Sequence, residues 1–293
     1  MKIQTSFCSL SKYSTIKELL QKELHLSSNL LKKHLPKNFL SKNVRNHDLI
    51  EVPLDLINND MINSSYIGPL IEVLFEDETF IVVNKPFGIH GHPLEYSERA
   101  TVLNFLRSKF EINFLSGRST NSERGLLYRL DQETSGVLIF VKDESLHDEL
   151  RQDFASLIKE KSYLAIVEGR LEIDREVIHF LEGSSRKGAI IKEDQGGQKC
   201  TSSMTTLKIL EGFTLVKVRL ESGFRHQIRA QLSLLGHPIA GDTLYGAKEA
   251  DRLYLHALQY GLECRGEYRS FSAEKEKLFC DFLNTDSLLK VSR

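Results

Sequence analysis

An aspartate and an arginine stand two positions apart in the polar stretch 128–136, directly before the apolar run 137–141. A run of that length, rich in branched and aromatic residues, predicts a strand buried on both faces. We therefore expect Asp131 and Arg129 on a loop at the mouth of a core strand, where Gly125 and Gly136 permit tight turns. Polar groups on a loop held by a rigid strand are a common way to build an active site. Taken alone, such a pair more often forms a surface ion pair or caps a turn.

The surrounding motifs favour the active site. Arg-Leu-Asp-x-x-Thr-Ser-Gly at 129–136, followed by an apolar strand and Lys142, resembles the catalytic motif of the RluA-type pseudouridine synthases. Further segments resemble that family in the same order along the chain, from about residue 71 to residue 272. They are Asn-Lys-Pro-x-Gly at 84–88, Lys-x-Tyr-x-Ala-x-Val-x-Gly at 161–169, His-Gln-Ile-Arg at 226–229, Gly-x-Pro-Ile-x-Gly-Asp-x-x-Tyr-Gly at 236–246 and Leu-His-Ala at 255–257.

The resemblance implies an α+β fold, in which helices flank a mixed, mostly antiparallel sheet. It also implies that Asp131 is the catalytic residue, that Tyr163 lies against the target base and that Arg229 pairs with the catalytic carboxylate. Arg129 is expected to fill the gap left by a base flipped out of the RNA. Isomerisation of uridine oxidises nothing and adds no group, so we expect neither a cofactor nor a metal.

Three positions depart from the family pattern. Tyr128 stands where the family usually has His, and Phe224 stands where it usually has Arg. Gln231 takes the place of a frequent His two residues after the Gln-Ile-Arg segment. These departures bear on RNA contacts and substrate choice rather than on the chemistry.

The N-terminal region predicts a second functional surface. Helix-like spacing of apolar residues runs through 15–35, Ser27 and Ser28 are candidate caps of a second short helix, and 49–52 is typical of a strand. No carboxylate occurs between Glu23 and Asp48, which leaves a local basic patch. This region resembles the S-four-type RNA-binding fold; the alternative is a helical appendage with a solvated basic face. The candidate RNA-binding residues are Lys32, Lys33, Lys37 and Lys42.

Composition and turn-forming residues indicate how the chain divides into domains. We expect an S-four-like domain over 1–60, a linker over 61–70 and a catalytic domain over 71–293, with a polar, turn-prone stretch at 57–65. The 293 residues carry a net charge of −1, and no apolar run reaches the length of a membrane helix. The four cysteines are scattered and no signal-peptide core is visible, so we expect a monomer in a reducing cytoplasm. His90 and His92 lack a third ligand nearby and make a poor metal site.

Patterning also predicts the elements around the motifs. We expect helices from Thr101, through the apolar positions 146–158 and from Ile228, and a strand over 213–220. The stretch 183–197 reads as a surface hairpin or loop.

Two functions compete with an RNA pseudouridine synthase. One is a related protein that binds RNA without modifying it. The other is a glycoside hydrolase, a class that normally needs two opposed carboxylates. In this sequence only Asp131 lies in a convincing motif. Within the enzyme interpretation, the substrate is structured RNA, with ribosomal RNA favoured over transfer RNA.

Overall fold

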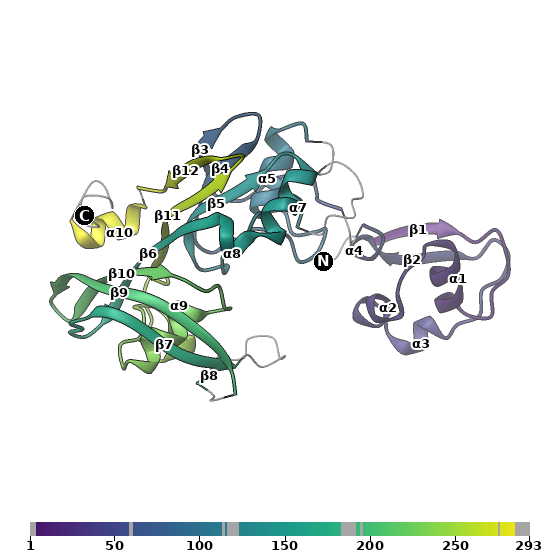
Figure 1. The fold of residues 1–293 in the computed structure, drawn as a ribbon. Coiled ribbons are helices and arrows are strands. Elements are labelled where there is room, and N and C mark those ends of the chain that lie inside the picture. Colours follow the sequence, from purple (N-terminus) through teal and green to yellow (C-terminus); the bar gives the residue numbers. More distant parts are fainter. Residues whose placement is uncertain are drawn as a thin grey trace. The chain divides into compact units, whose positions relative to one another are not determined.

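The computed structural model describes residues 4–58, 61–112, 115, 123–182, 192–193, 196–274 and 276–284 (Figure 1). The chain divides into two compact units. One consists of Met1–Gly68 with His92–Arg124, and the other of Pro69–Gly91 with Gly125–Arg293. The described residues of 92–124, which lie within the catalytic region expected from residue 71 onward, thus pack with the N-terminal part of the chain.

The first unit combines a two-stranded sheet with short helices. Thr15 and Ser27 cap two of these helices, because their hydroxyl oxygens accept hydrogen bonds from the backbone N–H groups of Glu18 and Leu30. The apolar faces of the helices meet the inner face of the sheet in a core that includes Leu20, which is fully buried. The elements are β1 (Gln4–Cys8) paired antiparallel with β2 (Leu49–Pro53), α1 (Ile16–Glu23), α2 (Ser28–His34), α3 (Lys37–Leu40), α4 (Leu54–Ile57) and α5 (Val102–Lys109).

The polar stretch that follows α4 is anchored within this unit. Ile62 is 1% exposed. The side-chain amide of Asn63 donates to the carbonyl of Tyr96 at 3.3 Å, and the backbone carbonyl of Asn63 accepts from the Asn104 amide at 2.9 Å. The described residues of this stretch, which the sequence predicts as a linker, are therefore hydrogen-bonded to the segment leading into α5.

The second unit is built on one large sheet. Its strand order is β3-β4-β5-β11-β6-β10-β9-β7-β8, and β12 pairs with β11. Among the described strands, β5 and β11 pair in parallel and the other pairs are antiparallel. The expected mixed, mostly antiparallel sheet is confirmed. The strands are β3 (Glu72–Glu76), β4 (Phe80–Lys85), β5 (Ser135–Val141), β6 (Ile158–Glu168), β7 (Asp174–Glu182), β8 (Lys192–Glu193), β9 (Gln198–Leu210), β10 (Phe213–Leu220), β11 (Leu255–Cys264) and β12 (Glu267–Ser272).

The strand after the aspartate loop lies in the middle of this core. All seven residues of β5 are buried, as its apolar run predicts. Gly136 is required there, since a Cβ on it would lie 2.1 Å from the carbonyl oxygen of Ala257 on β11. The close approach of two backbones fixes the point at which the polar loop enters the sheet.

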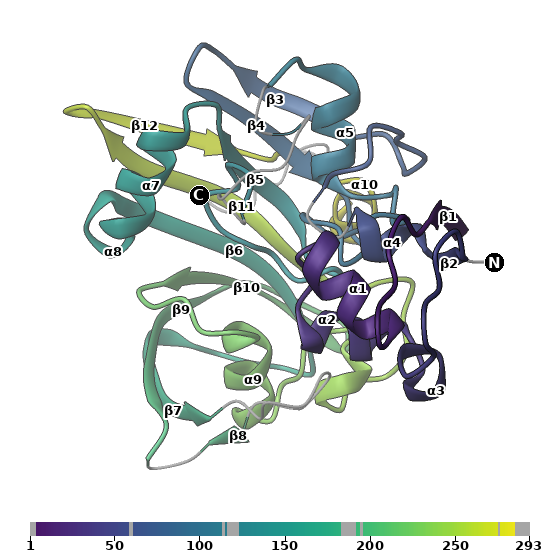
Figure 2. The same ribbon diagram turned by 90° about the vertical axis from the view of Figure 1, so that its right-hand side faces the viewer.

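Helices pack against this sheet at several points (Figure 2). The single helix expected through 146–158 is wrong: α7 (Glu144–Gln152) ends at Asp153, a short α8 (Phe154–Leu157) follows, and Ile158 already begins β6. The remaining helices are α9 (Gln227–Leu234), the 3-10 turn η1 (Thr243–Tyr245) and α10 (Lys277–Leu283). Most of the predicted 183–197 hairpin and the C-terminal residues 285–293 lie outside the described residues. None of the helices in the described ranges is long and apolar enough to cross a membrane.

Candidate active site

Asp131 lies in a tight turn just before β5. The backbone N–H of Thr134 donates to the carbonyl of Asp131 at 3.1 Å, which closes the turn. The Asp131 side chain is 30% exposed, whereas Ser135, where the strand begins, is fully buried. The carboxylate is thus presented to solvent from a rigid base. Arg129 is exposed on the approach to this turn.

A buried lysine contacts the same turn through the backbone carbonyl of Gln132. Lys85 at the end of β4 is fully buried and donates to the carbonyls of Pro86, Ile89 and Gln132 at 2.8 to 2.9 Å. Gln132 also exchanges hydrogen bonds with the backbone of Gly88. Burial lowers the pKa of Lys85 to about 7, while three carbonyl acceptors stabilise its ammonium form. The Asn-Lys-Pro-x-Gly motif thereby supports the aspartate turn.

Arg229 connects two carboxylates of unequal exposure. Its Nε and Nη2 donate to Asp242 at 2.7 Å each, and its Nη1 lies 3.4 Å from Oδ2 of Asp131. The Asp242 side chain is 1% exposed. A guanidinium bound at two nitrogens by a buried carboxylate has a fixed plane. Arg229 therefore offers Asp131 a cation of defined orientation, and Asp242 is its closer partner.

His226 approaches the same carboxylate from the N-terminus of α9. Its Nε2 lies 3.6 Å from Oδ2 of Asp131, and its Nδ1 is 3.1 Å from the hydroxyl of Tyr245. Burial lowers the pKa of His226, and the charge of Asp131 partly opposes that effect. The residue has a φ of +53°, a left-handed conformation that non-glycine residues adopt rarely. The backbone is thus held in an uncommon conformation beside the aspartate.

Three tyrosines form one cluster next to this centre. The hydroxyl oxygens of Tyr163 and Tyr260 are 2.5 Å apart, and the rings of Tyr260 and Tyr128 stack at 4.0 Å with an interplanar angle of 6°. Tyr128 also donates to the carbonyl of Val137 at 3.0 Å. Burial raises the pKa of Tyr163, and the charge of Asp131 adds to that rise. Tyr163 is therefore neutral. It is 6% exposed, and the charge of Asp131 affects the pKa of its hydroxyl.

The three departures from the family pattern have structural roles. Tyr128 belongs to the tyrosine cluster, and Phe224 packs against a small apolar cluster that includes Tyr245. Gln231 is fully buried and bonds to Ser202 and to the backbone carbonyls of Val177 and Cys200. In this structure Gln231 ties α9 to the sheet and is closed to a ligand.

The basic residues expected to bind RNA belong to the first unit. The side chain of Lys33 lies 4.0 Å from Glu95, and the ammonium of Lys42 lies 5.6 Å from the ring centre of Phe39. All four candidates are exposed, on α2, on α3 and in the turn after α3; they are Lys32, Lys33, Lys37 and Lys42.

Sequence reasoning missed the partners that orient the predicted residues. Asp242, His226 and Tyr260 received no role, because an acid after a glycine, a histidine before a helix and a tyrosine in a strand are all common. The signal that could have singled out Asp242 is its place in a motif that also supplies Tyr245. Across the described ranges, no three His, Cys, Asp or Glu side chains gather as they would around a metal ion.

Comparison with known proteins agrees with the motifs. The family model described as RNA pseudouridylate synthase matches residues 79–234. The uncharacterized RNA pseudouridine synthase YhcT of Bacillus subtilis is 35% identical over 195 residues, which cover 64% of this chain and 62% of that protein. The ribosomal large subunit pseudouridine synthase D of Borreliella burgdorferi is 32% identical over 261 residues, covering 84% of this chain and 77% of that protein. The chain thus spans about three fifths of the length of YhcT, which is among the most similar curated relatives.

Solved structures share the fold. Human RNA pseudouridylate synthase domain containing 1 superimposes with a TM-score of 0.58 at 21% identity, covering 71% of this chain and 86% of that one. Human RNA pseudouridylate synthase domain containing 4 gives a TM-score of 0.54 at 20% identity, covering 72% and 91%. With the family match extending over more than half of the chain, this protein belongs to the RNA pseudouridylate synthase family.

Proposed function

We propose that the protein is an RNA pseudouridine synthase that isomerises uridines in structured RNA, with Asp131 as the catalytic carboxylate. The observation that carries this proposal is the arrangement around Asp131. A partly exposed carboxylate is held on a rigid turn and faces Arg229, whose orientation is fixed by buried Asp242.

The reaction needs this kind of centre. The bond between ribose C1′ and uracil N1 breaks, the base turns and a bond forms between C1′ and C5. The proton of C5 leaves to water, and N1 takes up a proton from water, so the product is an isomer of the substrate. A carboxylate beside the sugar serves either as a nucleophile at C1′ or to assist departure of the base. Arg229 places a permanent positive charge 3.4 Å from Oδ2 of Asp131 and orients the carboxylate.

The target base must leave its stack to reach this carboxylate, at a cost of a few kcal/mol. We propose that Tyr163 faces the extruded base and that exposed Arg129 occupies the vacated position in the RNA. An Arg129→Ala variant that binds and modifies structured RNA as well as wild type would exclude the second role.

The arrangement disfavours a glycoside hydrolase. That chemistry uses a second carboxyl group as a proton donor or base across the scissile bond. The second carboxylate bound to Arg229 is Asp242, which is 1% exposed and has both oxygens engaged by the guanidinium. It is closed to a substrate.

We further propose ribosomal RNA as the substrate, supported by relatives named ribosomal large subunit pseudouridine synthase D in Zymomonas mobilis and Borreliella burgdorferi. Residues 1–60 would act as an S-four-like RNA-binding domain whose exposed lysines bind phosphates without reading sequence. We expect a monomer that works in the cytoplasm. The test is tritium release by the purified protein from ribosomal and transfer RNA labelled at uracil C5. Release from ribosomal RNA supports the proposal, and no release from either RNA refutes the activity.

A further inference from the structure

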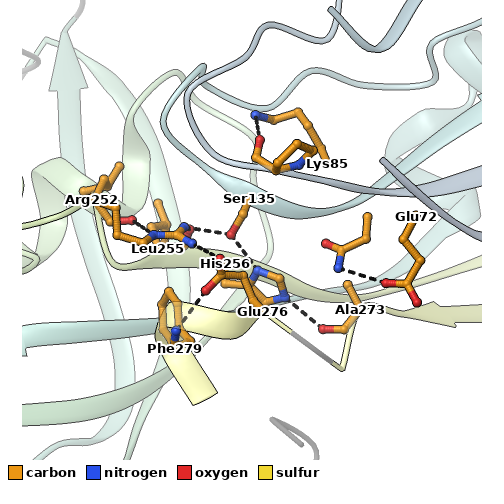
Figure 3. A network of polar contacts seen from close by, with 12 residues as sticks. Glu72, Lys85, Ser135, Arg252, Leu255, His256, Ala273, Glu276 and Phe279 are labelled. Atoms are coloured by element: carbon orange, nitrogen blue, oxygen red, sulfur yellow. Dashed lines mark hydrogen bonds and ion pairs between the residues drawn. The ribbon is translucent and has the colours of Figure 1, made fainter. Parts of the chain in front are cut away.

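A chain of buried hydrogen bonds passes through Ser135, the residue that follows the aspartate turn (Figure 3). Nη2 of Arg252 lies 2.8 Å from the hydroxyl of Ser135, and that hydroxyl lies 2.7 Å from Nδ1 of His256. Nε2 of His256 lies 2.8 Å from the carbonyl oxygen of Ala273. These groups have no role in the chemistry described above, yet Ser135 begins β5 four positions after Asp131.

The direction of every bond in this chain follows from its ends. The carbonyl of Ala273 only accepts, so Nε2 of His256 carries the hydrogen and Nδ1 is the acceptor. The Ser135 hydroxyl must then donate to Nδ1, and its oxygen accepts from Arg252, which only donates. His256 is fully buried, and burial lowers its pKa to about 3, so the imidazole stays neutral and its tautomer is fixed. Each group thus has one arrangement that satisfies all partners.

Arg252 is itself held on all sides. Its Nη1 lies 2.6 Å from Oε1 of Glu276, the N-cap residue of α10, and its Nε donates to the carbonyl of Leu253 at 2.9 Å. The guanidinium carbon lies 4.7 Å from the ring centre of Phe87 and 5.2 Å from that of Phe279. The α10 segment and the segment after β4 therefore enclose the cation that anchors Ser135.

We infer that Arg252, Ser135 and His256 are positioning residues that fix the backbone of the Asp131 turn, in addition to the support given by Lys85. This inference rests on the proposed function. Misplacement of a reacting group by about 1 Å costs up to about 100-fold in rate. A network with one hydrogen-bond arrangement restricts such displacement, whereas a loop held at one side alone retains freedom to shift.

Four variants separate this role from a general loss of packing. Ser135→Ala removes the central hydroxyl. His256→Gln keeps an N–H donor for the Ala273 carbonyl but loses the acceptor for Ser135, whereas His256→Asn keeps an acceptor near Nδ1 and loses the donor. Thr214→Val is the matched control, because the Thr214 hydroxyl is also buried and also both donates and accepts, to Gly169 and from Leu171, away from the turn.

Two readouts are taken on the full chain: hydrogen exchange of residues 129–136 by mass spectrometry, and kcat and KM for tritium release. We expect faster exchange over 129–136 and a kcat lower by about 10- to 100-fold in Ser135→Ala and His256→Gln, with KM for RNA unchanged. His256→Asn and Thr214→Val should keep wild-type exchange over 129–136.

Unchanged exchange in Ser135→Ala overturns the inference whatever the activity, and so does faster exchange with an unchanged kcat. If wild type releases no tritium while the exchange differences appear, the proposed function fails and the support of the turn stands.

Discussion

Arg229 binds Asp242 through Nε and Nη2 at 2.7 Å each, and this pair determines which nitrogen remains for Asp131. Arg229 and Asp242 are 9% and 1% exposed in their side chains, so the pair lies almost entirely out of water. Removal of one partner of a buried ion pair leaves an uncompensated charge, which is more costly than the pair itself is stabilising. Asp242 thus controls both the local stability and the orientation of the cation at the candidate active site.

Asp242→Ala should therefore lower the free energy of unfolding by about 3–5 kcal/mol and reduce tritium release far more than it changes RNA binding. Denaturant unfolding and steady-state kinetics measure the two effects. Asp174→Ala is the control, because Asp174 is exposed and bonds to the hydroxyl of Thr205 at the sheet surface. An unchanged free energy of unfolding, together with a kcat within twofold of wild type, would contradict the role of Asp242.

The acid limb of the pH profile should depend on His226. Burial lowers the pKa of this imidazole below its ordinary 6.5, so it is neutral at pH 7. As the pH falls through that lowered pKa, the imidazolium forms 3.6 Å from Oδ2 of Asp131 and competes with substrate for the carboxylate. The rate of isomerisation should fall as this imidazolium accumulates.

The variant His226→Asn tests whether His226 is the source of the acid limb. Asparagine is chosen because it tolerates the positive φ of this position. We expect the variant to lose that limb in a profile of kcat/KM between about pH 5 and pH 8. An identical acid limb in wild type and variant would exclude His226 as its source.

The position of Asp131 beside a buried strand could be predicted from the sequence, whereas the residues that orient the site could not. An apolar run after a polar motif sufficed to place Asp131 just before a buried strand, because burial on both faces demands such a run. The partners of the site could not be predicted in this way. Asp242 and His256 are far from Asp131 along the chain, and a polar residue becomes a partner only through the strand order that brings it there.

The helix expected through 146–158 failed for a local reason. The apolar spacing continues at a helical interval, but Asp153 takes φ −102° and ψ +23° at the end of α7, and Ile158 is drawn into β6 by its pairing with Leu262. Sheet pairing thus overrode a periodicity that favours helix. The packing of residues 92–124 with the N-terminal unit has no signal in periodicity, since it depends on interactions such as the hydrogen bonds between Asp55 and Ser97.

The loss of stability at low pH should depend on His256, which is neutral in the folded protein. Burial lowers the pKa of His256 from 6.5 to about 3 in the folded protein. Between these two pH values the unfolded chain therefore binds a proton that the folded chain does not. Stability contributed by this group is present above pH 6.5 and is lost as pH falls toward 3, by about 1.4 kcal/mol per pH unit.

His256→Gln should be less stable than wild type at pH 7 yet lose less stability on acidification, as measured by urea unfolding between pH 7 and pH 4. Parallel stability curves for the two proteins would show that His256 is not buried in its neutral form.

The exposed lysines of the N-terminal unit should determine the salt dependence of RNA binding. Replacement of Lys32, Lys33, Lys37 and Lys42 by alanine should weaken binding at low salt. It should also lower the slope of log K against log salt by about 0.7 to 0.9 for each phosphate that is no longer neutralised. Lys22→Ala is the control, because this exposed lysine already pairs with Glu18 at 2.7 Å. An unchanged slope in the fourfold variant would show that these lysines do not touch RNA.

The proposed isomerisation requires the carboxylate of Asp131, and Asp131→Asn removes its charge with almost no change in shape. The matched control is Glu133→Gln, since Glu133 is an exposed acid in the same turn. Both variants are compared with wild type for tritium release from RNA labelled at uracil C5, at equal folded fraction. We expect no detectable release by Asp131→Asn and near wild-type release by Glu133→Gln; substantial release by Asp131→Asn would contradict the catalytic role of this carboxylate.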